Sequence, residues 1–220
     1  MKLKLASLLI LATALLGAKH IKSYVPGWKA YAYSNSIPLT NLSGGGVSFA
    51  MPTSRKPDPN ASGNWVEYLL NDDTDPLPLG GFIHVTVSIA TSTPPPLFNW
   101  KSEAGNTCVG NPATFRPYFQ RGSFLNGDDY TRWWANGTVP SAVQLQAGTF
   151  SLSIPIDPAQ WSDTFGRRGD SSQAAIDGFN ASALAPTYIG GTFGGGCFFS
   201  HGVLVSGGSA TFSLLNWSAQ

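Results

Sequence analysis

The clearest pattern in this sequence is an alternation of apolar and polar residues along much of its length. A period of two places the apolar side chains of a segment on one face of a β-strand and the polar ones on the other. The alternation predicts strands over residues 83–89, 115–120, 143–146, 149–156, 203–205 and 210–214. Shorter segments of β-forming residues predict further strands over residues 28–33, 47–51, 65–70 and 188–193.

Dipeptides that favour turns separate these segments. They are Gly80-Gly81, Asn126-Gly127, Asn136-Gly137, Gly190-Gly191 and Gly207-Gly208. Short strands at such regular spacing, each with one apolar face, favour two antiparallel sheets that pack face to face. We therefore expect an all-β protein with a two-sheet antiparallel jelly-roll sandwich.

One segment departs from the period of two. Ile176, Phe179 and Ala183 recur at helical spacing, and Asp170 resembles the capping residue of a helix start. The pattern predicts one short helix over residues 172–184. We expect this helix to cover an end or an edge of the sandwich.

The first residues have the composition of an export signal. Lys2 and Lys4 precede an uncharged, mostly apolar run over residues 5–17. This run is too short to span a bilayer as a helix. We expect a signal peptide over residues 1–18 and a secreted protein, extracellular or periplasmic, with an uncleaved anchor as the alternative.

The length of 220 residues favours a single domain after this leader. Residues 19–46 predict an irregular segment with at most one edge strand, because prolines and a triple glycine interrupt it. Residues 47–220 are expected to form the β-sandwich domain.

The chain has two cysteines, Cys108 and Cys197. In an exported protein an even count favours a disulfide, and only one pairing is available. Closing a loop of roughly ninety residues stabilises a fold by about 4–5 kcal/mol in the chain-entropy model. The alternative is a pair of buried thiols.

The low charge of the chain limits the classes of partner that it is expected to bind. Charged residues make up 11% of the sequence, and the formal net charge is +1. Lys and Arg form no basic cluster of the kind that phosphate contacts require, so nucleic acid is not an expected partner. No second apolar run is long enough for a membrane span, and none is expected in the mature chain.

Residues 148–217 contain GTFSLSIPIDPAQW, then the predicted helix, then GGTFGGGCFFSHGVLVSGGSATFSLLNW. This order resembles the closing half of secreted jelly-roll domains such as carbohydrate-binding modules and galactose-binding-like domains. The resemblance covers about a third of the chain and consists of strands and turns. It implies non-catalytic sugar binding, on a concave sheet face or at loop tips.

The polar positions of the middle strands suggest where such a ligand would bind. They are Arg116, Tyr118, Gln120, Gln144 and Gln146, with Trp133 or Trp134 nearby. An aromatic ring beside amide and guanidinium groups suits a pyranose, whose apolar face packs on the ring while its hydroxyls need hydrogen-bond partners. The two tryptophans are adjacent, so they point to opposite faces of a strand. The alternative is an ordinary solvated sheet face.

Two acidic loops offer hard oxygen ligands of the kind that calcium prefers. One contains Asp73 and Asp75, and the other contains Asp128 and Asp129. Solvated turn aspartates are the competing interpretation, and no other cofactor is expected.

The chain has only two glutamates, Glu67 and Glu103. Either could serve a glycoside-active enzyme, which needs a carboxylate pair. The leading hypothesis is instead a secreted, non-catalytic protein that binds a glycan or a cell-surface polysaccharide. The competing hypothesis is a structural or interaction protein of the cell envelope or extracellular matrix.

Overall fold

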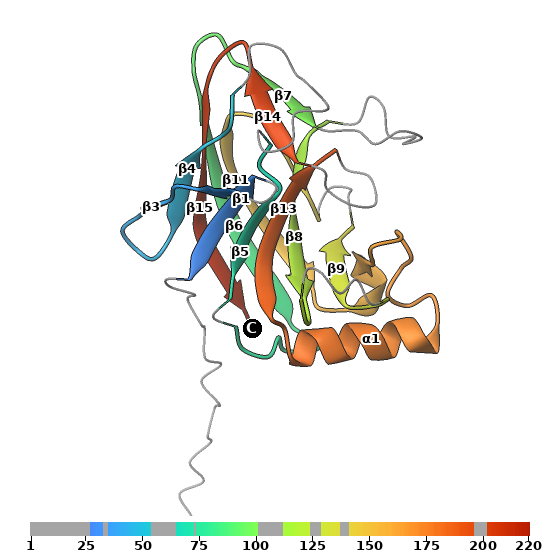
Figure 1. The fold of residues 1–220 in the computed structure, drawn as a ribbon. Helices are drawn as coiled ribbons and strands as arrows, with labels where there is room; N and C mark the ends of the chain where they lie inside the picture. Colours follow the sequence, from blue (N-terminus) through green and yellow to red (C-terminus); the bar gives the residue numbers. More distant parts are fainter. Residues whose placement is uncertain are drawn as a thin grey trace, which may run out of the picture.

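The computed structural model confirms the expected fold class. Two antiparallel sheets pack face to face, and one α-helix lies across the end of the sandwich where the chain terminates (Figure 1). The structure describes residues 27–32, 35–53, 65–72, 74–100, 112–123, 129–136, 141–195 and 202–220. The predicted signal peptide and both cysteines lie outside these residues, so neither the leader nor the Cys108–Cys197 pairing is described.

The larger sheet has eight strands in the order β12-β9-β8-β13-β5-β1-β2, with β10 also paired to β8. Every pairing in it is antiparallel. Its strands are β1 (Trp28–Ala32), β2 (Asn35–Ile37), β5 (Tyr68–Asn71), β8 (Thr114–Gln120), β9 (Arg132–Ala135), β10 (Val143–Gln144), β12 (Trp161–Ser162) and β13 (Tyr188–Gly194).

The smaller sheet has five strands in the order β11-β6-β15-β4-β3. They are β3 (Thr40–Asn41), β4 (Val47–Ala50), β6 (Phe82–Thr91), β11 (Gly148–Pro155) and β15 (Ala210–Ala219). A separate pair, β7 (Leu97–Trp100) and β14 (Val203–Ser206), lies at the other end of the sandwich from the helix (Figure 1). The chain passes repeatedly from one sheet to the other, as expected for a jelly roll.

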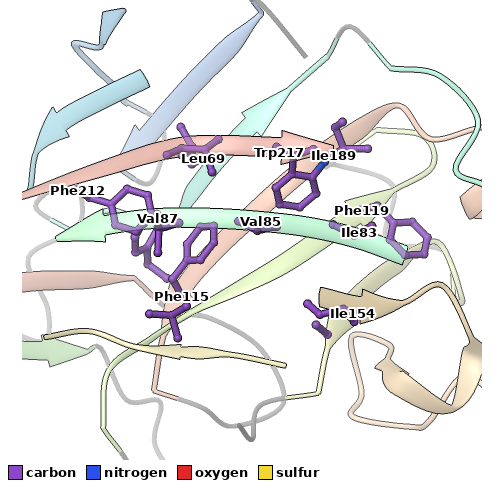
Figure 2. Packing of buried hydrophobic residues seen from close by; sticks show 14 of the residues in the cluster. Leu69, Ile83, Val85, Val87, Phe115, Phe119, Ile154, Ile189, Phe212 and Trp217 are labelled. Atoms are coloured by element: carbon purple, nitrogen blue, oxygen red, sulfur yellow. The ribbon is translucent and has the colours of Figure 1, made fainter. Parts of the chain in front are cut away.

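Large aromatic and branched side chains from both sheets fill the space between them (Figure 2). The ring of Phe212 on β15 lies 5.0 Å from Phe115 on β8 and 4.9 Å from Phe193 on β13. Phe49 on β4 lies 5.6 Å from Phe212. All four rings are buried. Because rings from both sheets meet here, this cluster joins the two layers.

The helix α1 (Gln173–Leu184) confirms the predicted helix to within one residue. It begins after Ser172, whose hydroxyl accepts a hydrogen bond from a backbone N–H in the first turn. The N-cap is therefore Ser172 and not Asp170. Phe179 inserts from α1 into the core, 5.3 Å from the rings of both Phe119 and Trp133.

The N-terminal segment is more regular than expected. Its described part, from residue 27 onward, contributes β1, β2 and β3 to the two sheets. β1 was expected at an edge, but it pairs with β5 on one side and with β2 on the other. Trp28 and Ala30 of β1 are buried in the core. The described part of residues 19–46 therefore belongs to the sandwich.

Replacing Phe212 by alanine should lower the free energy of unfolding by about 3–5 kcal/mol, because it leaves a cavity where the two sheets meet. The exposed neighbour Thr211 provides the matched control, since its replacement by alanine removes no core contact. Urea unfolding measures both variants. A loss below about 1 kcal/mol for Phe212→Ala would contradict the role given to this cluster.

Candidate functional site

The register of the larger sheet places most of the predicted ligand-binding residues on one face. Arg116, Tyr118 and Gln120 alternate along β8, and Gln144 on β10 stands opposite Thr114. Since side chains at alternate positions share a face, all of these residues point to the outer side of the sheet, away from the core. The expectation that they share a face is confirmed.

The expectation that they form an accessible platform is wrong. Arg116 is 2% exposed, and Tyr118 and Gln120 are fully buried, whereas Gln144 is exposed. Both tryptophans are buried as well. Trp133 points into the core beside Phe179, and Trp134 packs against Tyr118 on the outer side.

The buried side chains of Arg116, Tyr118 and Gln120 have hydrogen-bond partners within the chain, which explains how they tolerate burial. The Nε and Nη2 atoms of Arg116 donate to the carbonyl oxygen of Ala135, at 2.9 and 2.6 Å. The Tyr118 hydroxyl donates to Oε1 of Gln120, and Nε2 of Gln120 donates to the carbonyl of Gly122 at 3.0 Å. Burial lowers the pKa of Arg116 to about 10, so the guanidinium is charged at neutral pH. The Arg116 bonds tie β8 to β9, and the other two bonds lie within β8 and the turn that follows it.

Aromatic rings on the outer side of the larger sheet form what we call the tyrosine cluster: Tyr31, Tyr68, Tyr118, Trp134 and Tyr188. The Tyr118 ring lies 4.9 Å from Trp134 and 5.9 Å from Tyr68. Tyr118 and Trp134 are buried, but Tyr31, Tyr68 and Tyr188 keep part of their surface in solvent. The cluster therefore has a buried base and an accessible edge.

A glycine on β13 allows these rings to meet. Gly190 stands between Tyr118 on β8 and Leu70 on β5 in the register of the sheet. Its φ is +148°, and a Cβ added there would lie 2.1 Å from the carbonyl oxygen of Leu69. No side chain fits at this position. Tyr68 and Tyr118 can consequently approach each other across β13.

One ion pair lies on the same face as the accessible edge of the tyrosine cluster. Lys29 Nζ and Asp72 Oδ2 form an ion pair at 2.5 Å, half in solvent. The hydrogen bond between them, followed by their charges, raises the pKa of Lys29; the same hydrogen bond lowers the pKa of Asp72. Lys29 and Tyr31 occupy alternate positions of β1, so the ion pair lies on the same face of the sheet as the Tyr31 ring.

The hydroxyls of Tyr68 and Tyr118 resist ionisation. Desolvation, and next the charge of Glu67, raises the pKa of Tyr68 to about 12. Desolvation raises the pKa of Tyr118 well above its ordinary value, while Arg132 acts in the opposite direction. Both hydroxyls are therefore protonated donors at neutral pH.

One exposed aromatic side chain that the sequence did not predict lies in the segment before α1. Phe165 is 62% exposed. The guanidinium carbon of Arg167 lies 4.9 Å from the Phe165 ring centre and 4.4 Å from that of Tyr130. The buried carboxylate of Asp163 accepts hydrogen bonds from the Arg167 backbone and side chain, at 2.9 and 2.6 Å. The sequence signal was an aspartate two residues before Phe165, which is typical of an Asx turn.

The calcium and catalytic candidates lie partly beyond the described residues. Asp73, Asp128 and Glu103 fall outside them. Asp129 Oδ2 lies 3.6 Å from Arg167 Nη2, as a member of an ion pair. Within the described part of the chain, no three His, Cys, Asp or Glu side chains are placed to share a metal ion. A calcium site at either acidic loop and a role for Glu67 in catalysis stay expectations.

Comparisons of this chain with protein-family models, with curated protein sequences and with solved structures returned no match in any of the three. In the ranges that the structure describes, no helix has both the length and the apolar character needed to cross a membrane.

Raising the pH should destabilise the protein between about pH 10 and pH 12. Tyr68 ionises near its ordinary value of 10.0 in the unfolded chain, but only at about 12 in the folded one. Ionisation of Tyr68, and likewise of Tyr118, therefore stabilises only the unfolded state in this interval. Deprotonation of Arg116, whose pKa falls to about 10 in the folded state, acts in the opposite direction. The two tyrosines outweigh the one arginine, so the free energy of unfolding falls as pH rises through the interval. Urea unfolding at several pH values measures the slope. Tyr68→Phe and Tyr118→Phe should each flatten it, and an unchanged slope in both would contradict the assignment.

Proposed function

We propose that the protein binds carbohydrate, as a glycan or a cell-surface polysaccharide, through the accessible edge of the tyrosine cluster. The observation that carries the proposal is the arrangement of Tyr31, Tyr68 and Tyr188 on three adjacent strands, β1, β5 and β13. They are half-buried on the outer side of the sandwich. The packing of the core between the two sheets therefore does not explain why aromatic residues occupy these three positions.

The chemistry of this surface suits a neutral sugar. Tyrosine rings offer an apolar face on which the C–H face of a pyranose can pack, and their hydroxyls donate and accept hydrogen bonds. Lys29 and Asp72 add charged partners for sugar hydroxyls at the rim. Tyr118 and Trp134 pack beneath the accessible rings and limit their movement. Ligand binding would therefore cost less conformational entropy of these side chains.

Alanine substitution of the rim tyrosines tests the proposal. Tyr188→Ala and Tyr31→Ala should each weaken polysaccharide binding about tenfold or more, since each removes a stacking surface. Affinity electrophoresis in gels that contain different soluble polysaccharides, together with a glycan array, measures the loss.

Phe165→Ala is the matched control, because Phe165 is an exposed aromatic residue outside the cluster. Its binding should equal that of the wild type. Tyr188→Phe separates stacking from hydrogen bonding, since it keeps the ring. Binding that survives both alanine substitutions, or that falls equally in Phe165→Ala, would refute the assignment to the tyrosine cluster.

We propose further that the chain is exported, loses its leader near Ala18 and forms the Cys108–Cys197 disulfide. The apolar run behind Lys2 and Lys4 and the even cysteine count support this. Mass spectrometry of the exported protein should find a new N-terminus and a chain lighter by two hydrogens than its reduced form. Alkylation of both cysteines without prior reduction would contradict the disulfide.

A further inference from the structure

The smaller sheet carries almost no charge. None of its five strands contains Asp, Glu, Lys or Arg, and His84 is its one ionisable side chain. Hydroxyl side chains line its outer face, and one row crosses all five strands in register: Thr149, Ser88, Ser213, Ser48 and Thr40. Soluble β-proteins usually interrupt such faces and their edges with charges, which prevent association. Their absence points to a surface that meets a partner.

The edge of this sheet at β11 differs from the other edges of the sandwich. Among the strands that the structure describes, the other edge strands of the two sheets are β2, β3, β10 and β12, with three, two, two and two residues. β11 has eight residues and no charge. Very short edge strands protect a sheet from pairing with another chain, and β11 lacks this protection.

The hydrogen-bond pattern shows which groups of β11 point away from the sheet. Ile156 bonds through its N–H to the carbonyl of Gly81, and Phe82 bonds to Gln220 in the direction of β15. In an antiparallel ladder the backbone N–H and C=O groups of successive residues point alternately to the two sides of a strand. These bonds therefore show that the backbone groups of even-numbered β11 residues point toward β6. The N–H and C=O groups of Thr149, Ser151 and Ser153 therefore point outward. The described residues supply no backbone partner for them.

The core is also incomplete along this edge. Phe150 and Leu152 point inward from β11 and pack against the core, yet both stay partly exposed. Ile154, two residues further along, is only 1% exposed. A further strand beside β11 would cover Phe150 and Leu152 and would complete the hydrogen bonds of the edge.

We propose that β11 pairs with β11 of a second copy of this chain, antiparallel and related by a two-fold axis at Ser151. This register uses all three outward-pointing residues, since Thr149 of each copy then stands opposite Ser153 of the other. It forms about six backbone hydrogen bonds and joins two five-stranded sheets into one. Phe150 of each copy stands opposite Leu152 of the other.

A second copy fits this edge because a strand without charge can oppose itself without repulsion. The same register aligns hydroxyl side chains with hydroxyl side chains and apolar with apolar. The second copy is therefore complementary to β11 from Thr149 to Ser153. Because the two-fold pair uses both β11 edges, no other long edge strand is left among the described ones on which further copies could add.

Light scattering coupled to size exclusion tests the pairing in the mature wild-type protein, over about 1–100 µM, where small interfaces associate. We expect a dimer. Ser151→Lys should weaken it at least about tenfold, because the two-fold axis sets each new lysine against its copy. Ser88→Lys is the control, since Ser88 has the same outer face but lies on the interior strand β6. It should leave the dimer intact.

Mixing Ser151→Lys with Ser151→Glu should restore a dimer of one chain of each kind, which native mass spectrometry resolves. Ser151→Pro removes an outward N–H, together with the side-chain hydrogen bond between Ser151 and Thr86, and gives a second test that adds no charge. A wild type that is monomeric throughout would overturn the proposal. So would a dimer that Ser151→Lys and Ser88→Lys weaken equally, or one that Ser151→Pro leaves unchanged.

Discussion

The outer side of the larger sheet depends on the burial of β8 on both of its faces. One face, with Phe115 and Phe119, belongs to the core between the sheets. The other carries Arg116, Tyr118 and Gln120, and a buried polar group is stable only where it finds a hydrogen-bond partner. Here the partners are the Ala135 carbonyl, the neighbouring side chain and a turn carbonyl. Because these contacts fix β8, the aromatic rings beside it are held in one arrangement.

The sequence predicted the fold class, the position of α1 and most of the strands because they depend on local patterns. Alternation is regular on β6 and on β15 as far as Leu214, since one face of the smaller sheet is core and the other is solvent. A β-bulge between Leu214 and Asn216 interrupts it in the rest of β15. The same rule failed on β8. A strand buried on both faces can still alternate, and polar residues there indicate internal hydrogen bonds and not a solvated face. The sequence cannot distinguish these cases without the neighbouring strands.

The candidate site was predicted only in part for a related reason. Tyr118 was expected on this outer face, while the choice between Trp133 and Trp134 was left open; the structure places Trp134 beside Tyr118. Tyr31, Tyr68 and Tyr188 were missed because they come from strands far apart in the chain, and only the order β8-β13-β5-β1 brings them together. Short strands such as β2, β3 and β12 were missed because two or three residues carry no period.

The two outer faces of the sandwich differ in how the surrounding salt acts on them. The larger sheet carries the Lys29–Asp72 pair, half in solvent, and dissolved ions screen such charges over about 8–10 Å. The smaller sheet has no fixed charge for ions to screen. Contacts made through its hydroxyls and backbone should consequently keep their strength from dilute to brackish media. Because the charges lie on one face of the sandwich, a change of ionic strength acts on that face and leaves the other unaffected.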